Sequence, residues 1–145
     1  MDQLTTFVTN NWILVGALLV ILILLTYSYI GGSLRGYAST SPGEAVKMIN
    51  RDDALVLDVR EDTEYQEGHI INAMHLPLSQ LDDKMKKLEK HKEQPIIVAC
   101  RSGQRSGQAC ATLKKAGFDN VYNLGGGILA WKNANLPLVN QKQSK

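Results

Sequence analysis

The hydrophobic pattern divides the chain into an apolar N-terminal segment and a mixed remainder. Residues 12–30 read WILVGALLVILILLTYSYI, a run without a charge. A helix over this run would rise about 28 Å, close to the thickness of the bilayer's hydrocarbon core. Trp12 lies at one end and Tyr27 and Tyr29 near the other, positions that suit the two membrane interfaces. The pattern predicts one uncleaved transmembrane helix, because a secretory signal would carry Lys or Arg before a shorter apolar run.

From residue 41 onward, short apolar runs alternate with amphipathic segments. Residues 41–44, SPGE, predict a helix start with Ser at the N-cap, Pro at the first helical position and Glu completing a capping box. Uninterrupted apolar runs indicate strands that are covered on both faces. Strands are expected at 54–59, 70–76, 95–99 and 121–124. Helices are expected at 42–50, 61–67, 81–91, 104–116 and 127–133.

Strands that alternate with helices over short loops predict an α/β domain with a mainly parallel central sheet flanked by helices. The single transmembrane helix precedes this domain. The expected boundaries are an N-terminal flank at 1–11, the transmembrane helix at 12–30, a linker at 31–40, the soluble domain at 41–139 and a flexible tail at 140–145.

The charge pattern predicts the orientation of the transmembrane helix and excludes one class of function. Sixteen Lys and Arg against fourteen Asp and Glu give a net charge of +2, too small for a strongly basic nucleic-acid binder. Asp2 is the only charged residue before Arg35, while Lys47 and Arg51 follow the apolar run. Positive flanks stay cytoplasmic, so the expected location is the inner (plasma) membrane with the domain facing the cytoplasm.

Cysteine and histidine usage narrows the chemistry. Two cysteines exclude a disulfide-rich scaffold and a four-cysteine zinc site, and the three histidines lack metal-ligand spacing. Cys110 would lie about 9 Å along the helix that follows Cys100, beyond the distance a disulfide can bridge. Cys110 is therefore expected to be a core thiol, and no metal is expected.

Cys100 is the candidate nucleophile. It ends the buried strand of the segment 96–107, IIVACRSGQRSG, at the edge where α/β folds place ligands. A tight loop of small residues can aim backbone N–H groups at the sulfur, and Arg101 and Arg105 add positive charge. These features favour a thiolate. The alternative, a merely structural buried cysteine, fits such an electropositive turn poorly.

Four motifs in order resemble the rhodanese (thiosulfate sulfurtransferase) family over residues 41–136. Along the chain they are DVR at 58–60, EYQEGHIINA at 64–73 with Pro77 beyond it, CRSGQRS at 100–106 and LGGGILAW at 124–131. An anchor followed by a single such domain is similar to the layout of small membrane-anchored bacterial rhodaneses.

The resemblance implies that Cys100 takes sulfane sulfur as a persulfide and needs no cofactor. The loop that would bind substrate and persulfide comprises Arg101, Ser102, Gly103, Gln104 and Arg105. Arg101 could bind the incoming anion and Arg105 could fix the loop by bonding carbonyls; these roles stay open. The spacing C-x4-R is one residue shorter than the C-x5-R of the related phosphatases, which disfavours phosphatase activity.

Other polar residues of the motifs are expected to be structural. Asp58 would orient backbone, Arg60 would pair with Glu64, and His69 would be a hydrogen-bonded support rather than a base. The basic segment with Lys84, Lys86, Lys87, Lys90 and Lys92 is expected to be a solvated face or to lie against anionic lipid.

The expected function is a membrane-anchored sulfurtransferase that moves sulfane sulfur from thiosulfate or another donor to a thiophilic acceptor. The alternative is a rhodanese-fold docking module for a membrane protein, with little or no turnover. The expected partners are a small sulfur donor and acceptor, the lipid bilayer and a membrane protein, with no nucleic acid.

Overall fold

The computed structural model describes residues 2–31 and 36–140, and the chain divides into two units at Arg35. The N-terminal unit holds helix α1 (Asp2–Asn10) and helix α2 (Trp12–Gly31). Over the two described ranges, no helix reaches the combined length and apolarity of a membrane-crossing segment. The transmembrane helix expected at 12–30 is therefore not supported. Helix α1 was not expected in the flank at 1–11.

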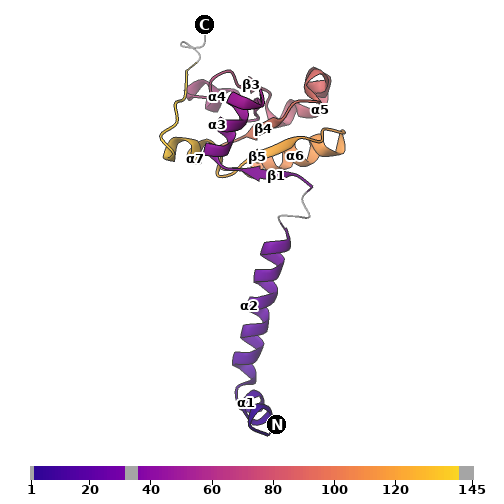
Figure 1. The fold of residues 1–145 in the computed structure, drawn as a ribbon, viewed down its shortest axis with the longest axis vertical. Helices are drawn as coiled ribbons and strands as arrows, with labels where there is room; N and C mark the ends of the chain where they lie inside the picture. The colour runs from indigo at the N-terminus through magenta and orange to yellow at the C-terminus, as the bar shows by residue number, and fades with distance from the viewer. Residues whose placement is uncertain (1, 32–35, 141–145) are drawn as a thin grey trace. The chain divides into compact units, whose positions relative to one another are not determined.

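The second unit is built on a five-stranded sheet whose neighbouring strands all pair in parallel. The strand order is β1-β5-β4-β2-β3 (Figure 1). The strands are β1 (Ala38–Thr40), β2 (Leu55–Asp58), β3 (Met74–His75), β4 (Ile96–Ala99) and β5 (Val121–Leu124). The expected α/β class with a parallel central sheet is confirmed.

Helices connect the strands. The α-helices are α3 (Pro42–Arg51), α4 (Asp62–Glu67), α5 (Leu81–Lys84), α6 (Gln104–Lys115) and α7 (Gly127–Asn133). Two 3-10 helices, η2 (Leu78–Gln80) and η3 (Met85–His91), flank α5. Helix α3 begins as its sequence predicts, because Ser41 and Glu44 cap each other reciprocally and Pro42 opens the first turn.

Three local expectations were wrong. Residues 38–40 form edge strand β1 instead of linker, and the short polar sequence AST gave no apolar run to reveal it. Strand β3 has only two residues, because the chain turns at Ala73, whose N–H donates to the Ile70 carbonyl. The expected helix over 81–91 is α-helical only through Lys84 and then continues as 3-10 helix.

The core lies on both faces of the sheet, as the unbroken apolar strands predict. Alternate residues of β4 enter different clusters: Val98 packs with α6, whereas Ile97 packs with α3 and α7. Cys100 and Cys110 belong to the α6-side cluster, and Trp131 of α7 belongs to the opposite one. Trp131 thus packs the last helix onto the sheet, as expected.

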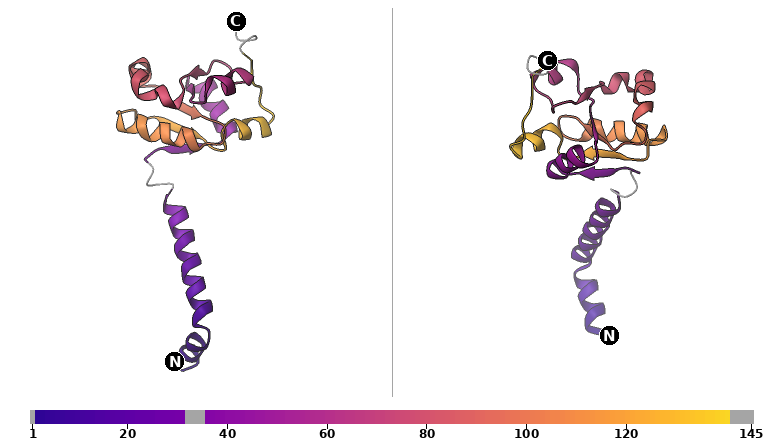
Figure 2. Two further views of the ribbon diagram at one scale, coloured as in Figure 1. Left: turned by 180° about the vertical axis from the view of Figure 1, so that it is seen from behind. Right: turned by 45° about the horizontal axis from the view of Figure 1, so that its top comes forward.

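The topology defines a binding edge. Along the chain, β2 leads outward to β3, whereas β4 leads to β5 on the other side, so the winding direction reverses between β2 and β4. Figure 2 shows the sheet and its helices from two further directions. In open parallel sheets, ligands bind at the carboxyl ends of the strands where this reversal occurs. Asp58 ends β2 at this edge, and Cys100 follows β4 directly.

Candidate active site

Cys100 lies at the bottom of the loop between β4 and α6, with only 1% of its surface exposed. Its Sγ accepts a hydrogen bond from the Gly103 N–H at 3.1 Å. The Ser106 Oγ lies 3.2 Å from the same sulfur. The loop therefore curls back over the side chain of its own first residue, as the sequence predicts.

Two glycines permit this tight loop. Gly103 has φ 99°, and a Cβ there would lie 3.4 Å from both the Leu124 carbonyl and the Gly126 nitrogen. Gly127 has φ 60°, and its Cβ would lie 2.4 Å from the Cys100 carbonyl oxygen. The positive φ favours glycine at both positions, and at Gly127 the backbone also blocks the side-chain direction. Gly127 is thus needed to seat α7 against the loop.

The loop stabilises the ionised form of Cys100. Burial raises the pKa of the Cys100 thiol, because a buried charge loses its hydration. Hydrogen bonds from Ser106 and from the backbone N–H groups of the loop oppose this effect and outweigh it, so the pKa lies below its ordinary value. A thiolate is the nucleophilic form of cysteine, so the site suits covalent catalysis.

Ser106 and Asn123 complete the sulfur's surroundings, and sequence reasoning did not single them out. The Ser106 hydroxyl lies 2.6 Å from Asn123 Oδ1, and Asn123 Nδ2 donates to the Gly103 carbonyl at 3.0 Å. A hydroxyl has one hydrogen and can donate to the sulfur or to the amide oxygen, not to both at once. When Cys100 is ionised, that hydrogen can turn to the sulfur. The polar Asn123 within the short strand VYNL is the sequence signal that could have revealed this contact.

Arg105 is held by a carboxylate and not by carbonyls. Its two terminal nitrogens donate to the two oxygens of Glu64, each at 2.7 Å. This bidentate bond with Arg105 lowers the pKa of Glu64 to about 2, although partial burial acts in the opposite direction. The pair fastens the start of α6 to α4, which fixes one end of the Cys100 loop.

The expected pairing of Arg60 with Glu64 was wrong. Arg60 instead folds back onto Asp58, with Nη2 2.7 Å from Oδ2, and donates to the Gly68 carbonyl at 2.8 Å. Asp58 also accepts from the Arg60 backbone N–H at 3.1 Å, which is the backbone-orienting role expected of it. All of these groups are buried, so the pair is a local brace between β2 and α4.

Arg101 is the free cation of the loop. Its residue is exposed, and within residues 36–140 its side chain makes no hydrogen bond or ion pair. It lines a small cavity of about 130 Å³. The cavity's other lining residues are Arg60, Glu64, Glu67, Ile128, Leu129 and Lys132. The two arginines of the loop therefore differ: Arg105 is committed to Glu64, while Arg101 is open to an incoming anion.

The remaining loop residues differ in how they are placed. Gly103 is half-buried and supplies its N–H to the sulfur, as noted above, whereas Ser102 and Gln104 are exposed. Ser102 contributes to the Cys100 site through its backbone and not through its hydroxyl. Gln104 opens helix α6.

His69 and Cys110 lie outside the chemistry. His69 is buried and stacks on Tyr65 with ring centroids 3.8 Å apart, and its Nδ1 lies 3.0 Å from the Tyr65 carbonyl. Burial raises the pKa of Cys110 to about 12, so it is an inert core thiol and not a partner for Cys100. Among the residues that the structure describes, no three His, Cys, Asp or Glu side chains gather as a metal site.

Comparisons with known proteins place this site in a family. The Rhodanese-like domain model matches residues 41–134. The uncharacterized protein YibN of Escherichia coli (strain K12) is 36% identical over 127 residues, 87% of each chain. The thiosulfate sulfurtransferase GlpE of Coxiella burnetii is 36% identical over 96 residues, which are 66% of this chain and 88% of that protein.

A solved structure agrees with these matches. The rhodanese-related protein from Thermoplasma volcanium is similar with a TM-score of 0.65 and 34% identity, over 71% of this chain and 98% of that one. The YibN match covers more of this chain than the family domain does and so extends into the N-terminal segment. With its domain, its loop and its relatives in agreement, the chain belongs to the rhodanese family.

Proposed function

We propose that the protein is a sulfurtransferase that carries sulfane sulfur on Cys100 as a persulfide. The observation that carries this proposal is the Cys100 sulfur, which receives hydrogen bonds from Gly103 and Ser106 and has a lowered pKa. A relative that is 36% identical over 96 residues is named a thiosulfate sulfurtransferase, which makes thiosulfate the first donor to test.

The first half-reaction balances without a cofactor. The Cys100 thiolate attacks the outer sulfur of thiosulfate, a new S–S bond forms, and the S–S bond of thiosulfate breaks. The electron pair of the broken bond leaves with sulfite. Cys100 is left as a persulfide anion, and the positive charge of Arg101 at the mouth of the loop favours the approach of the dianionic donor.

The second half-reaction restores the enzyme. A thiophilic acceptor, such as cyanide in the laboratory, attacks the outer sulfur of the persulfide, and the Cys100 thiolate is the leaving group. Donors that stabilise a thiolate also make it a good leaving group, so the same hydrogen bonds serve both halves. The two-step scheme predicts ping-pong kinetics.

Mass spectrometry tests the proposal directly. After incubation with thiosulfate and removal of the donor, intact wild-type protein should gain the mass of one sulfur atom, and peptide mapping should place it on Cys100. Cys110→Ser is the matched control and should gain the same sulfur, because Cys110 is buried and fully protonated. A wild-type chain that gains no sulfur from thiosulfate or from other sulfane donors would overturn the proposal.

We also propose that the protein is located at a membrane through α2. The basis is its uncharged sequence and its large exposed side chains, which include Trp12 at 71% and Tyr27 at 78% exposure. Such apolar surface is normally covered by lipid or protein. Cell fractionation tests this location. Recovery of the full chain in the membrane fraction, and its release when Leu18, Ile21 and Leu25 are all changed to Asn, would support it; recovery of the wild type in the soluble fraction would contradict it.

A further inference from the structure

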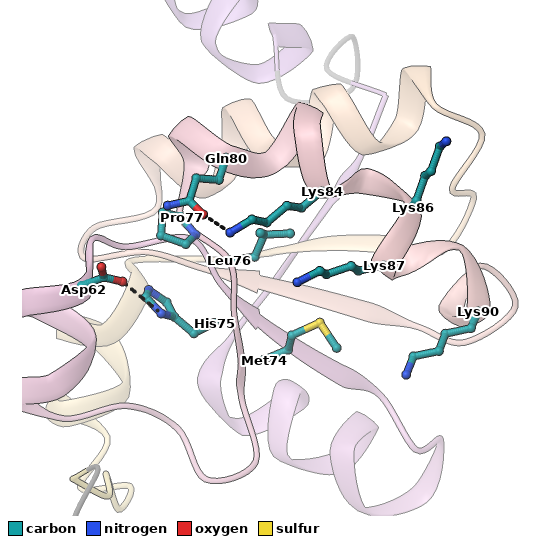
Figure 3. Close-up of a pocket in the computed structure, with 10 residues that line it drawn as sticks. All are labelled: Asp62, Met74, His75, Leu76, Pro77, Gln80, Lys84, Lys86, Lys87 and Lys90. Atoms are coloured by element: carbon teal, nitrogen blue, oxygen red, sulfur yellow. Dashed lines mark hydrogen bonds and ion pairs between the residues drawn. The ribbon is translucent and has the colours of Figure 1, made fainter.

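A second, larger cavity lies beside strand β3, and its lining shares no residue with the Cys100 loop. It has a volume of about 720 Å³. Figure 3 shows its lining residues, which are Asp62, Met74, His75, Leu76, Pro77, Gln80, Lys84, Lys86, Lys87 and Lys90. The lining includes four lysines and one carboxylate, so the cavity has an excess of positive charge.

Three of these lysines recur at every third residue, two of them within the 3-10 helix η3 and one directly before it. A 3-10 helix has three residues per turn, so side chains at i, i+3 and i+6 lie above one another, about 6 Å apart along the axis. Lys87 and Lys90 lie within η3 at this spacing, and Lys84 is the residue directly before η3. In Figure 3 these three side chains extend toward the side of Met74 and His75, whereas Lys86 points away.

The packing of η3 explains why the row faces outward. Met85 and Leu88 form the adjacent row and pack into the core, with Leu88 fully buried. This anchors the helix about its axis and leaves the lysine row at the surface. Seven residues is long for a 3-10 helix, and an α-helix would have fanned the lysines apart.

The amines of this row lack protein anions. Lys84 donates to the Gln80 side chain, which carries no charge. Within residues 36–140, Lys87 and Lys90 make no hydrogen bond or ion pair. The one carboxylate of the cavity, Asp62, lies 3.5 Å from His75 instead. The row is therefore open to an external anion.

We infer that this row binds an extended acidic segment of a partner protein, with Asp or Glu at every second position. In an extended chain, alternate side chains share one face and repeat at about 6.6 Å, close to the spacing of the lysines. Strand β3 is the edge of the sheet, where an extended peptide can add. The concave shape favours a single chain over a flat lipid surface, and Met74 and Leu76 supply an apolar floor.

Peptide binding to the full chain in nonionic detergent tests the inference. The probe is a fluorescent peptide of four Glu-Thr repeats, and the matched peptide has four Glu followed by four Thr. The alternating peptide should bind more tightly, and its affinity should fall as salt is raised. Changing Lys84, Lys87 and Lys90 together to Gln should weaken it about tenfold, since each exposed pair contributes modestly.

The control removes the same charge elsewhere. Changing Lys47, Arg51 and Lys115, which lie outside the cavity, together to Gln should alter affinity less than about twofold. Lys87→Glu should weaken the acidic peptide and strengthen a Lys-Thr repeat, a gain that misfolding would not produce. Equal binding of the two acidic peptides, equal losses in both triple variants, or tighter binding of tripolyphosphate than of the alternating peptide would overturn the inference.

Discussion

At the residue scale, the ionisation of Cys100 depends on a hydroxyl that can donate either to the sulfur or to a neighbouring amide oxygen. Ser106 touches both Cys100 and Asn123, and only one of them can receive its hydrogen at a time. The Gly103 N–H is the fixed donor, since it belongs to the backbone. Ser106 is therefore the side chain whose removal should change the ionisation of the sulfur most selectively.

Ser106→Ala should raise the pKa of Cys100, because a hydrogen bond that lowers it is lost while burial remains. Alkylation of Cys100 by iodoacetamide at neutral pH should slow about tenfold, the effect of one hydrogen bond to a charged group. Ser102→Ala is the control, since Ser102 acts through its backbone. Equal alkylation rates in the wild type and in Ser106→Ala would contradict this role.

Glu64→Gln should lower the free energy of unfolding by about 1–2 kcal/mol at neutral pH, because it breaks a bidentate pair that is only partly exposed. The folded pKa of Glu64 is about 2, below the ordinary 4.5. A lowered pKa stabilises the fold fully above about pH 4.5 and loses this effect as the pH falls toward 2.

Urea unfolding from pH 7 down to pH 3 measures this dependence. The difference between wild type and Glu64→Gln should shrink as the pH falls below 4.5. Glu67→Gln, a change on the exposed end of the same helix, should show no such difference. A gap between wild type and Glu64→Gln that stays constant over the whole range would show that the ion pair does not act as described.

At the element scale, helix α7 holds the active-site loop from one side. The Ile128 N–H donates to the Cys100 carbonyl at 2.8 Å, and the Leu129 N–H donates to the Arg101 carbonyl at 3.2 Å. The first turn of α7 therefore satisfies the backbone that follows β4. The close approach that this requires is possible only because Gly127 has no side chain.

Gly127→Ala should lower the free energy of unfolding by at least about 2 kcal/mol, since the new Cβ would strike the Cys100 carbonyl in a strained conformation. The rate of alkylation of Cys100 at neutral pH should also fall, because the shifted loop no longer holds its hydrogen-bond donors at the sulfur. Gly43→Ala is the control, because nothing lies within 4 Å of a Cβ there. That variant should be neutral or slightly more stable in thermal melting. Similar losses in both variants would argue against the close fit of α7.

Elements with strong local signals could be predicted from the sequence, and those fixed by tertiary pairing could not. The capped start of α3, the buried strand β4 and the bounds of α7 followed from residue patterns alone. Strand β1 has no apolar run and exists because β5 pairs with it. The change from α-helix to 3-10 helix after Lys84 likewise has no signal in the sequence.

The site was predictable where it depends on the loop and not where it depends on distant side chains. Cys100 and its curled loop could be expected from strand, glycine and helix order. The partners of Arg60 and Glu64 could not, because Arg105 is 41 positions from Glu64 and meets it only in the folded chain. The same reason hid Asn123, which reaches the loop from the next strand.

At the scale of the whole molecule, the sheet brings the chemistry together and keeps the second thiol apart. The reversal of winding between β2 and β4 gathers the Asp58 brace and the Cys100 loop at one edge. Cys110 lies on α6 in the core and is fully buried. One sulfur with a lowered pKa in a closed loop suits the proposed role of a carrier that loads and unloads a single atom.

The stoichiometry of sulfite release tests this account most directly. Purified protein mixed with thiosulfate, with no acceptor present, should release sulfite in a burst of one equivalent per chain and then stop. Cys110→Ser should give the same burst, and addition of cyanide should restart release. No burst in the wild type, or an equal burst from Cys100→Ser, would contradict the claim that Cys100 carries the sulfur.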